Sequence, residues 1–272
     1  MSNIFSQPQK FCRFIYKDKI YYGLVEGDSI FALNTEPWNN FQKSNNPIQK
    51  EKVKLLNPTN PRTIVGLIKS YKQSWEGKNP PKTVRWFIKP PNAAGIPGND
   101  IVLPLSLDEV KVEVEMIIII GKKIKNGNEI DAKEAIFGYT VGCDVMGNQS
   151  SFHRINNEPQ DADENALGLG LKACDGFEPY GPFIYKKVDW QNKKTFLQIT
   201  NGEGKNIINY EDNTSNLLYS PEKIVSDLSK VMTLSPGDII SSGTGKSFIA
   251  KVGDTVNLQI ENLGGFSFKI EK

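Results

Sequence analysis

Alternation of polar and apolar residues is the clearest pattern along this chain. Residues 110–116, with the sequence VKVEVEM, alternate strictly, and this pattern predicts a β-strand. The valines and the methionine occupy one face of this strand, and Glu113 and Glu115 occupy the other. The two carboxylates therefore point the same way, roughly 7 Å apart at about 3.3 Å per residue.

A second alternating segment adds another carboxylate. Residues 138–145, GYTVGCDV, predict a strand with Asp144 on its polar face. Three converging acids raise one another's pKa unless a divalent cation neutralises them. An all-oxygen ligand set favours Mg²⁺, Mn²⁺ or Ca²⁺ over zinc. A one-sided, solvated sheet gives the same alternation, so the pattern alone leaves a purely structural alternative open.

Only two segments carry clear helix signals. One covers residues 132–137, where Asp131 is the expected N-cap and Gly138 the stop. The other covers residues 221–232, with Ser220 as the N-cap and a proline at the first helical position. Strand signals outnumber these helices, so we expect an α+β fold that is predominantly β.

The strand pattern also suggests two domains. Short strands fill residues 11–33, and the polar segment 34–56 follows them. We therefore expect a small N-terminal β unit over residues 1–56 and a catalytic domain over residues 57–272. The last strands of the chain predict a hairpin whose turn lies at residues 262–265.

Composition restricts the possible partners and the compartment. The 272 residues are 38% hydrophobic, which is enough for a sizeable core. A net charge of +2 without a long Lys/Arg block gives no case for nucleic-acid binding. We find no signal peptide and no apolar run long enough to span a membrane. Three widely spaced cysteines fit reduced thiols, and we expect a cytoplasmic protein.

Seven segments follow one another in a recognisable order. They are FIKPP at 87–91, the E-x-E strand at 113–115, FGYTVGCDV at 137–145, KACDGFEPYGPFI at 172–184, TNGE at 200–203, LSPGDIISSGTG at 234–245 and KVGDTV at 251–256. Taken in this order, they resemble the fumarylacetoacetate hydrolase family. The resemblance covers about residues 60–272, and the small β unit resembles the family's N-terminal extension.

The resemblance implies a mixed β-roll, or β-sandwich roll, which usually pairs as a homodimer. Such proteins act on small 2-oxo acids or 1,3-dicarbonyl compounds by isomerisation or tautomerisation, decarboxylation or C–C hydrolysis. The family's metal ligands fall on Glu113, Glu115 and Asp144, the residues that the alternation also selects. Mg²⁺ or Mn²⁺ held there would act as a Lewis acid that stabilises an enolate.

The resemblance also assigns roles to other residues. Lys172 matches the active-site lysine, although a surface lysine before a turn would look the same. Thr244 and the neighbouring Gly243 match a turn that contacts the substrate carboxylate, and Tyr71 matches a retained substrate-site tyrosine. Lys89 resembles a retained position at the lip of the pocket, but we interpret it as a lysine at the end of a strand.

The lid departs from the family pattern. Hydrolytic and decarboxylating members carry a His and a Glu on a short lid helix, where this chain has Ser74 and Gly77. Its single histidine, His153, lies outside the lid, and we predict that it is a substitute proton shuttle, although an exposed loop histidine without a function is the commoner case. We expect the polar segment 149–171 to fold over the pocket and the Pro- and Gly-rich stretch 79–98 to form a functional loop.

A second departure follows Asp144. The family's Arg and Gln, which help to build an oxyanion pocket, are replaced here by Asn148 and Ser151. Losing such a donor typically costs roughly 10²–10³ in rate where it stabilises an oxyanion. The retained residues therefore favour tautomerisation or decarboxylation over hydrolysis.

Three interpretations follow from these features. The protein is a divalent-metal enzyme on a small 2-oxo acid or dicarbonyl compound, or a catalytically diminished relative that binds a carboxylate ligand or a protein partner. The third interpretation is a structural β protein without a functional metal. Metal titration separates the third interpretation from the others, and turnover separates the first two.

Overall fold

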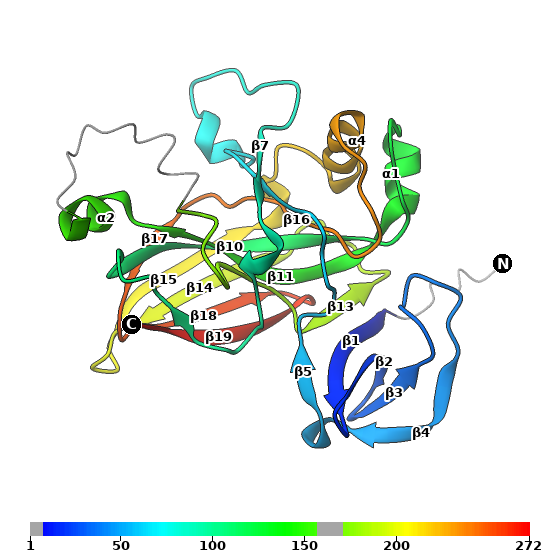
Figure 1. The fold of residues 1–272 in the computed structure, drawn as a ribbon. Coiled ribbons are helices and arrows are strands. Elements are labelled where there is room, and N and C mark those ends of the chain that lie inside the picture. Colours follow the sequence, from blue (N-terminus) through cyan, green and yellow to red (C-terminus); the bar gives the residue numbers. More distant parts are fainter. Residues whose placement is uncertain (1–7, 157–170) are drawn as a thin grey trace.

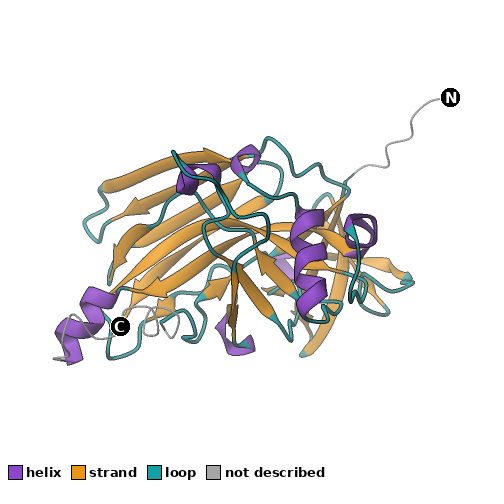
Figure 2. Cartoon of the chain, turned by 90° about the horizontal axis from the view of Figure 1, so that it is seen from above, coloured by secondary structure: helices purple, strands orange, loops and turns teal. Residues whose placement is uncertain are grey.

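The computed structural model describes residues 8–156 and 171–272 and is predominantly β, as the sequence predicts. The strands form a twelve-stranded sheet, a five-stranded sheet and a two-stranded sheet. In two perpendicular views the helices lie outside the strand layers (Figure 1, Figure 2). The expected β-roll type of fold is confirmed.

The large sheet runs in the order β4-β3-β2-β1-β13-β11-β10-β16-β6-β7, with β5 on β1 and β17 on β10. Its strands are β1 (Gln9–Tyr16), β2 (Lys19–Glu26), β3 (Ser29–Leu33), β4 (Lys43–Gln49), β5 (Lys54–Leu56), β6 (Ile64–Leu67), β7 (Trp86–Lys89), β10 (Glu109–Ile120), β11 (Ile136–Gly147), β13 (Phe183–Lys186), β16 (Ile239–Ser241) and β17 (Phe248–Lys251).

The five-stranded sheet runs in the order β15-β14-β18-β19-β9, and β12 pairs with β8. These strands are β8 (Ala94–Gly95), β9 (Ile101–Val102), β12 (Glu178–Pro179), β14 (Lys194–Thr200), β15 (Asn206–Asn213), β18 (Thr255–Ile260) and β19 (Gly264–Glu271). The predicted C-terminal hairpin is β18 and β19, with Val256 opposite Phe268.

Strand β10 is buried on both faces, and its two faces belong to different clusters. Its even-numbered residues, such as Val112 and Met116, pack in the main core with Leu197 and Val256 of the five-stranded sheet. Further along the strand, the odd-numbered face buries Ile117 in a second cluster that includes residues of β1 and β2. The two glutamates therefore extend from a strand that is held firmly on both sides.

The N-terminal strands join the rest of the sheet without a break. β1 pairs antiparallel with β13, and β5 returns to pair with β1. The polar segment 34–56 thus contains β4 and β5 rather than a simple linker. The division into residues 1–56 and 57–272 stays a prediction.

Both predicted helices are present, but their bounds were predicted with different accuracy. Helix α1 is Glu129–Ala135, three residues earlier than expected, because Asn128 and not Asp131 is its N-cap. Asp131 instead completes the capping box by accepting a bond from the Asn128 backbone. Helix α4 is Pro221–Val231, and the Ser220 hydroxyl accepts from the Lys223 amide as predicted. The two helices lie side by side (Figure 1).

Two segments expected to be loops contain regular structure. The stretch 79–98 holds β7, a short 3₁₀ turn and β8, so the prediction of one long loop there was wrong. Helix α2 (Gln149–Asn156) opens the segment 149–171, whose residues 157–170 lie outside the described residues. Among the described residues, none of the helices is both long enough and apolar enough to cross a bilayer.

Candidate metal centre and active site

Three carboxylates meet where β10 and β11 pair. Glu113 lies directly opposite Asp144 in the antiparallel register, and Glu115 follows two residues along the same face. One oxygen from each of these carboxylates lies within 4.8 Å of the others. Glu115 and Asp144 are each 1% exposed, whereas Glu113 is only partly buried. The predicted convergence of the three carboxylates is therefore present, and the alternative of a solvated sheet face does not hold for Glu115 and Asp144.

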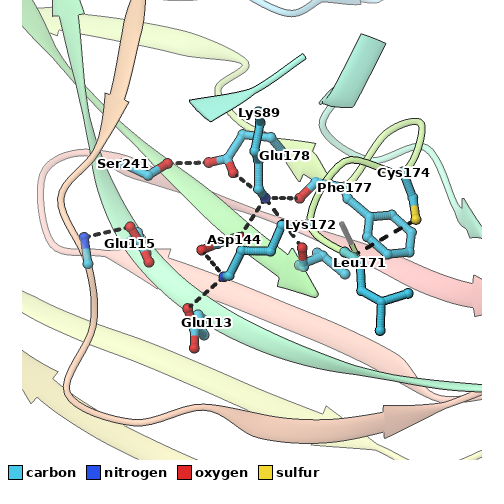
Figure 3. Close-up of polar contacts among 12 residues, drawn as sticks. Lys89, Glu113, Glu115, Asp144, Leu171, Lys172, Cys174, Phe177, Glu178 and Ser241 are labelled. Atoms are coloured by element: carbon cyan, nitrogen blue, oxygen red, sulfur yellow. Dashed lines mark hydrogen bonds and ion pairs between the residues drawn. The ribbon is translucent and has the colours of Figure 1, made fainter. Parts of the chain in front are cut away.

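Two lysines sit among these acids (Figure 3). The Lys172 ammonium contacts Asp144 and lies 3.7 Å from a Glu113 oxygen. The Lys89 ammonium lies 2.5 Å from the second Asp144 oxygen and 2.7 Å from Glu178. Glu178 also accepts a hydrogen bond from the Ser241 hydroxyl. Asp144 is thus held between two ammonium groups.

Lys89 is the residue whose role the sequence interpretation missed. It is 1% exposed and not at the lip of a pocket, because it shares the inward face of β7 with Phe87 while Ile88 faces outward. Its ammonium also donates to the carbonyl of Phe177 at 2.7 Å. The alternation of β7 could have indicated that Phe87 and Lys89 share a face, but not that acids lie opposite.

Charge and burial shift the pKa values of this cluster in opposite directions. Burial, together with the charge of Asp144, raises the pKa of Glu113 to about 7 and that of Glu115 well above its usual range. Burial alone would raise the pKa of Asp144, but the charges of Lys89 and Lys172 outweigh it and lower that pKa. Burial opposes the positive form of Lys172, yet the charges of Asp144 and Glu113 raise its pKa overall.

The donor set fits a hard divalent cation. Four carboxylates and two ammonium groups lie together, so the ionised cluster carries a net charge of −2. One divalent ion would balance that charge, and carboxylate oxygens are the ligands that Mg²⁺ and Mn²⁺ prefer. Glu113, Glu115 and Asp144 are the residues that would hold it.

A cavity of about 390 Å³ opens onto this cluster. Glu113, Glu115 and Lys172 line it, and so do Ser74 and Thr244. A volume of this size suits a small-molecule ligand. The candidate metal centre and the candidate substrate space are therefore contiguous.

Four predicted site residues do not line this cavity in the part of the chain that the structure describes: Asp144 and Gly243, which contact residues that do, and Tyr71 and His153. Tyr71 is 1% exposed and precedes the 3₁₀ turn Lys72–Trp75, and burial raises its pKa far above the usual range. His153 lies on α2 and is 4% exposed, so it is not the exposed loop histidine that is the common case. The roles assigned to Tyr71 and His153 stay predictions.

Gly243 connects the loop after β16 to the carboxylate cluster. Its backbone N–H donates to Glu115 at 2.6 Å, and its φ of +89° suits glycine. A Cβ at this position would lie 1.8 Å from the Ser70 Oγ, which itself donates to the carbonyl of Ser242 at 2.6 Å. The loops after β6 and β16 therefore approach so closely that only glycine fits.

Replacing Gly243 with Ala is expected to destabilise the protein by about 3 kcal/mol and to weaken metal binding, because strain and the clash both displace the amide from Glu115. The matched control is Gly204→Ala, since Gly204 also has a positive φ of +81° but open space around it. That variant should lose only about 1–2 kcal/mol. Denaturant unfolding and metal titration of both variants provide the measurement, and equal losses would contradict the close approach.

The comparisons with known proteins agree with this geometry. The family described as fumarylacetoacetate (FAA) hydrolase C-terminal matches residues 58–271. The chain belongs to the fumarylacetoacetate hydrolase family. A second family, described as Rv2993c-like, N-terminal, matches residues 9–58.

Members of the fumarylacetoacetate hydrolase family from several organisms resemble the chain. A fumarylacetoacetate hydrolase domain-containing protein 2 homolog of Dictyostelium discoideum is 34% identical over 261 residues, which cover 87% of this chain and 82% of the relative. A 4-hydroxyphenylacetate degradation bifunctional isomerase/decarboxylase of Salmonella dublin is 33% identical, over 68% of this chain and 41% of its own length.

The fold comparison gives the same family. The crystal structure of 5-carboxymethyl-2-hydroxymuconate delta-isomerase from Mycobacterium smegmatis superposes with a TM-score of 0.80 at 26% identity. The match covers 96% of this chain and 99% of that one. The relatives of this family are named as hydrolases, isomerases and decarboxylases, which supports an enzyme.

Proposed function

We propose that this protein is a Mg²⁺- or Mn²⁺-dependent enzyme that acts on a small 2-oxo acid or 1,3-dicarbonyl compound. The observation that carries the proposal is the carboxylate cluster of Glu113, Glu115 and Asp144, which opens into a cavity beside Lys172. The isomerase and isomerase/decarboxylase relatives support this class of substrate. A cytoplasmic homodimer remains part of the proposal.

The cluster would hold the ion through one oxygen of each carboxylate. A divalent ion supplies positive charge against the negative charge that develops on a substrate keto oxygen. Lys89 orients Asp144 by its ion pair at 2.5 Å, and the Gly243 amide orients Glu115. Because this amide is used in that way, we assign contact with the substrate carboxylate chiefly to Thr244 and a positioning role to Gly243.

Lys172 is the proposed proton carrier. In the metal-free protein the charges of Asp144 and Glu113 raise the pKa of this ammonium, and its position in the cavity beside the carboxylate cluster suits it to exchange a proton with a substrate carbon or oxygen. The Phe87 ring lies 4.9 Å from this ammonium and limits the positions that the side chain can take. Ser74 offers no water-activating base, so we propose tautomerisation or decarboxylation ahead of C–C hydrolysis.

The direct test is a screen for turnover with Mg²⁺ and with Mn²⁺. The panel contains oxaloacetate, acylpyruvates, fumarylpyruvate and 2-hydroxymuconate-type dienes, each assayed with and without a chelator. Metal-dependent turnover of one of these compounds would support the enzyme. Metal binding without turnover across the panel would favour the alternative, a catalytically diminished protein that binds a carboxylate ligand or a protein partner.

Two variants separate the possible proton carriers. Lys172→Met should lower kcat by roughly 10²-fold or more on the compound found in the screen, because it removes a positioned acid. His153→Gln should give a comparable loss only if this histidine shuttles protons, and near wild-type turnover would rule it out as a proton carrier. Metal affinity measured by calorimetry should stay unchanged in His153→Gln.

A further inference from the structure

Two lysines without an assigned role line the outer part of the cavity. Lys69 and Lys246 are both exposed to solvent and both line the space that leads to Glu113 and Glu115. Among the described residues lining this cavity, those two glutamates are the only negatively charged ones. The cavity therefore has an acidic floor, where the ion would be held, and a basic outer part.

The sheet topology explains why both lysines line the same cavity. β6 and β16 are adjacent and parallel, with Val65 opposite Ile240, so the loops that follow them leave the same edge of the sheet. Lys69 lies on the first loop and Lys246 on the second. The hydrogen bond from Ser70 Oγ to the Ser242 carbonyl ties the two loops together.

Each of the two lysines has an aromatic neighbour. Lys69 has a positive φ of +50°, and its carbonyl accepts from the Trp75 indole at 2.7 Å. A non-glycine residue in this conformation is uncommon and often marks a functional position. The Lys246 ammonium lies 5.2 Å from the centre of the Phe248 ring. Within residues 8–156 and 171–272, neither lysine forms an ion pair with a carboxylate.

We propose that Lys69 and Lys246 bind a second carboxylate of the substrate, at the end remote from the carboxylate cluster. This inference rests on the proposed function and narrows the substrate class to 2-oxo acids with two carboxylates. A dicarboxylate would place its 2-oxo acid end near Lys172 and Thr244, and its other carboxylate between the outer loops.

Electrostatics supports this arrangement. The unmatched ammonium groups attract an anion, while a neutral or apolar end would remove them from water without compensation. Lysine is a flexible point charge, so the pair can follow carboxylates at slightly different positions. Discrimination is then expected to depend on the charge of the distal group rather than on its exact shape.

The test compares two ligands that share the same 2-oxo acid end and differ in the presence of a second carboxylate. Binding of 2-oxoglutarate and of 2-oxobutyrate, which lacks the second carboxylate, is measured by calorimetry on Mg²⁺-loaded protein. The variants are Lys69→Gln/Lys246→Gln and, as the matched control, Lys78→Gln, an exposed lysine of the same segment that does not line the cavity.

The double variant should lose about tenfold in affinity for 2-oxoglutarate and nothing for 2-oxobutyrate, because two exposed charge contacts are removed. Lys78→Gln should match the wild type. Equal weakening of both ligands, or no change in either, would overturn the inference while leaving the proposed function intact, since 2-oxobutyrate would still bind. A wild type that binds neither ligand with any metal would overturn both.

Discussion

Glu115→Gln is expected to lower the affinity for Mg²⁺ and Mn²⁺ by more than about 100-fold, since even residues that merely orient metal ligands are typically worth 10–100-fold. Glutamine keeps the size of the side chain but removes its negative charge. In this chain it also loses part of the bond from the Gly243 amide, which donates to Glu115 at 2.6 Å. Calorimetric titration with each metal measures the change.

The unfolding temperature, measured with and without metal, gives a second test of this prediction. Metal that binds only the folded protein raises the unfolding temperature, so wild type should be stabilised by millimolar Mg²⁺ and Glu115→Gln should not. The metal-free variant should be at least as stable as the wild type, because it no longer buries a third acid beside Glu113 and Asp144. That result would also show that the variant is folded.

Glu109→Gln is the matched control for this experiment. Glu109 lies on the same strand and the same face as Glu115 but outside the cluster, where it pairs with Lys251 at 3.9 Å. Its replacement should leave metal affinity within about twofold of wild type. If wild-type protein binds no divalent metal at millimolar concentration, the catalytic proposal fails with it.

Lys89→Met should reduce the free energy of unfolding by about 3–5 kcal/mol, the usual result of removing one partner from a buried ion pair. The side chain of Lys89 is 0% exposed and separates Asp144 from Glu178, each within 2.7 Å of its ammonium. Without it, the two buried carboxylates face each other. Denaturant unfolding of the metal-free protein gives the number directly.

Two further variants show whether charge is the cause. Lys89→Met/Glu178→Gln removes both the ammonium and one unpaired carboxylate, and it should recover at least half of the lost stability. Lys122→Met removes a surface ion pair with Glu134, whose side chains are 66% and 62% exposed, and should cost less than about 1 kcal/mol. A Lys89→Met protein as stable as Lys122→Met would contradict the structural role of the ion pair.

The local sequence pattern was sufficient for the parts of the site that one pair of strands builds. Alternation fixes which residues share a face, so it placed Glu113 and Glu115 together and put Asp144 on the polar face of its own strand. The order of the motifs then indicated the family and the fold, which the comparisons confirm. Capping chemistry located α4 for the same local reason, although at α1 the predicted cap, Asp131, is the third residue of the capping box and Asn128 is the N-cap.

Contacts between distant segments were decided only by the tertiary structure. Lys89 meets Glu178 across 89 positions of sequence, and the Gly243 amide meets Glu115 across 128. The alternation of polar and apolar residues within one strand does not predict such a pairing, because the pairing depends on which strands become neighbours in the sheet. The sequence by itself determined the acids, the fold family and the candidate lysine, Lys172. The parallel pairing of β6 and β16 determined which further side chains, Lys69 and Lys246 among them, line the cavity that leads to those acids.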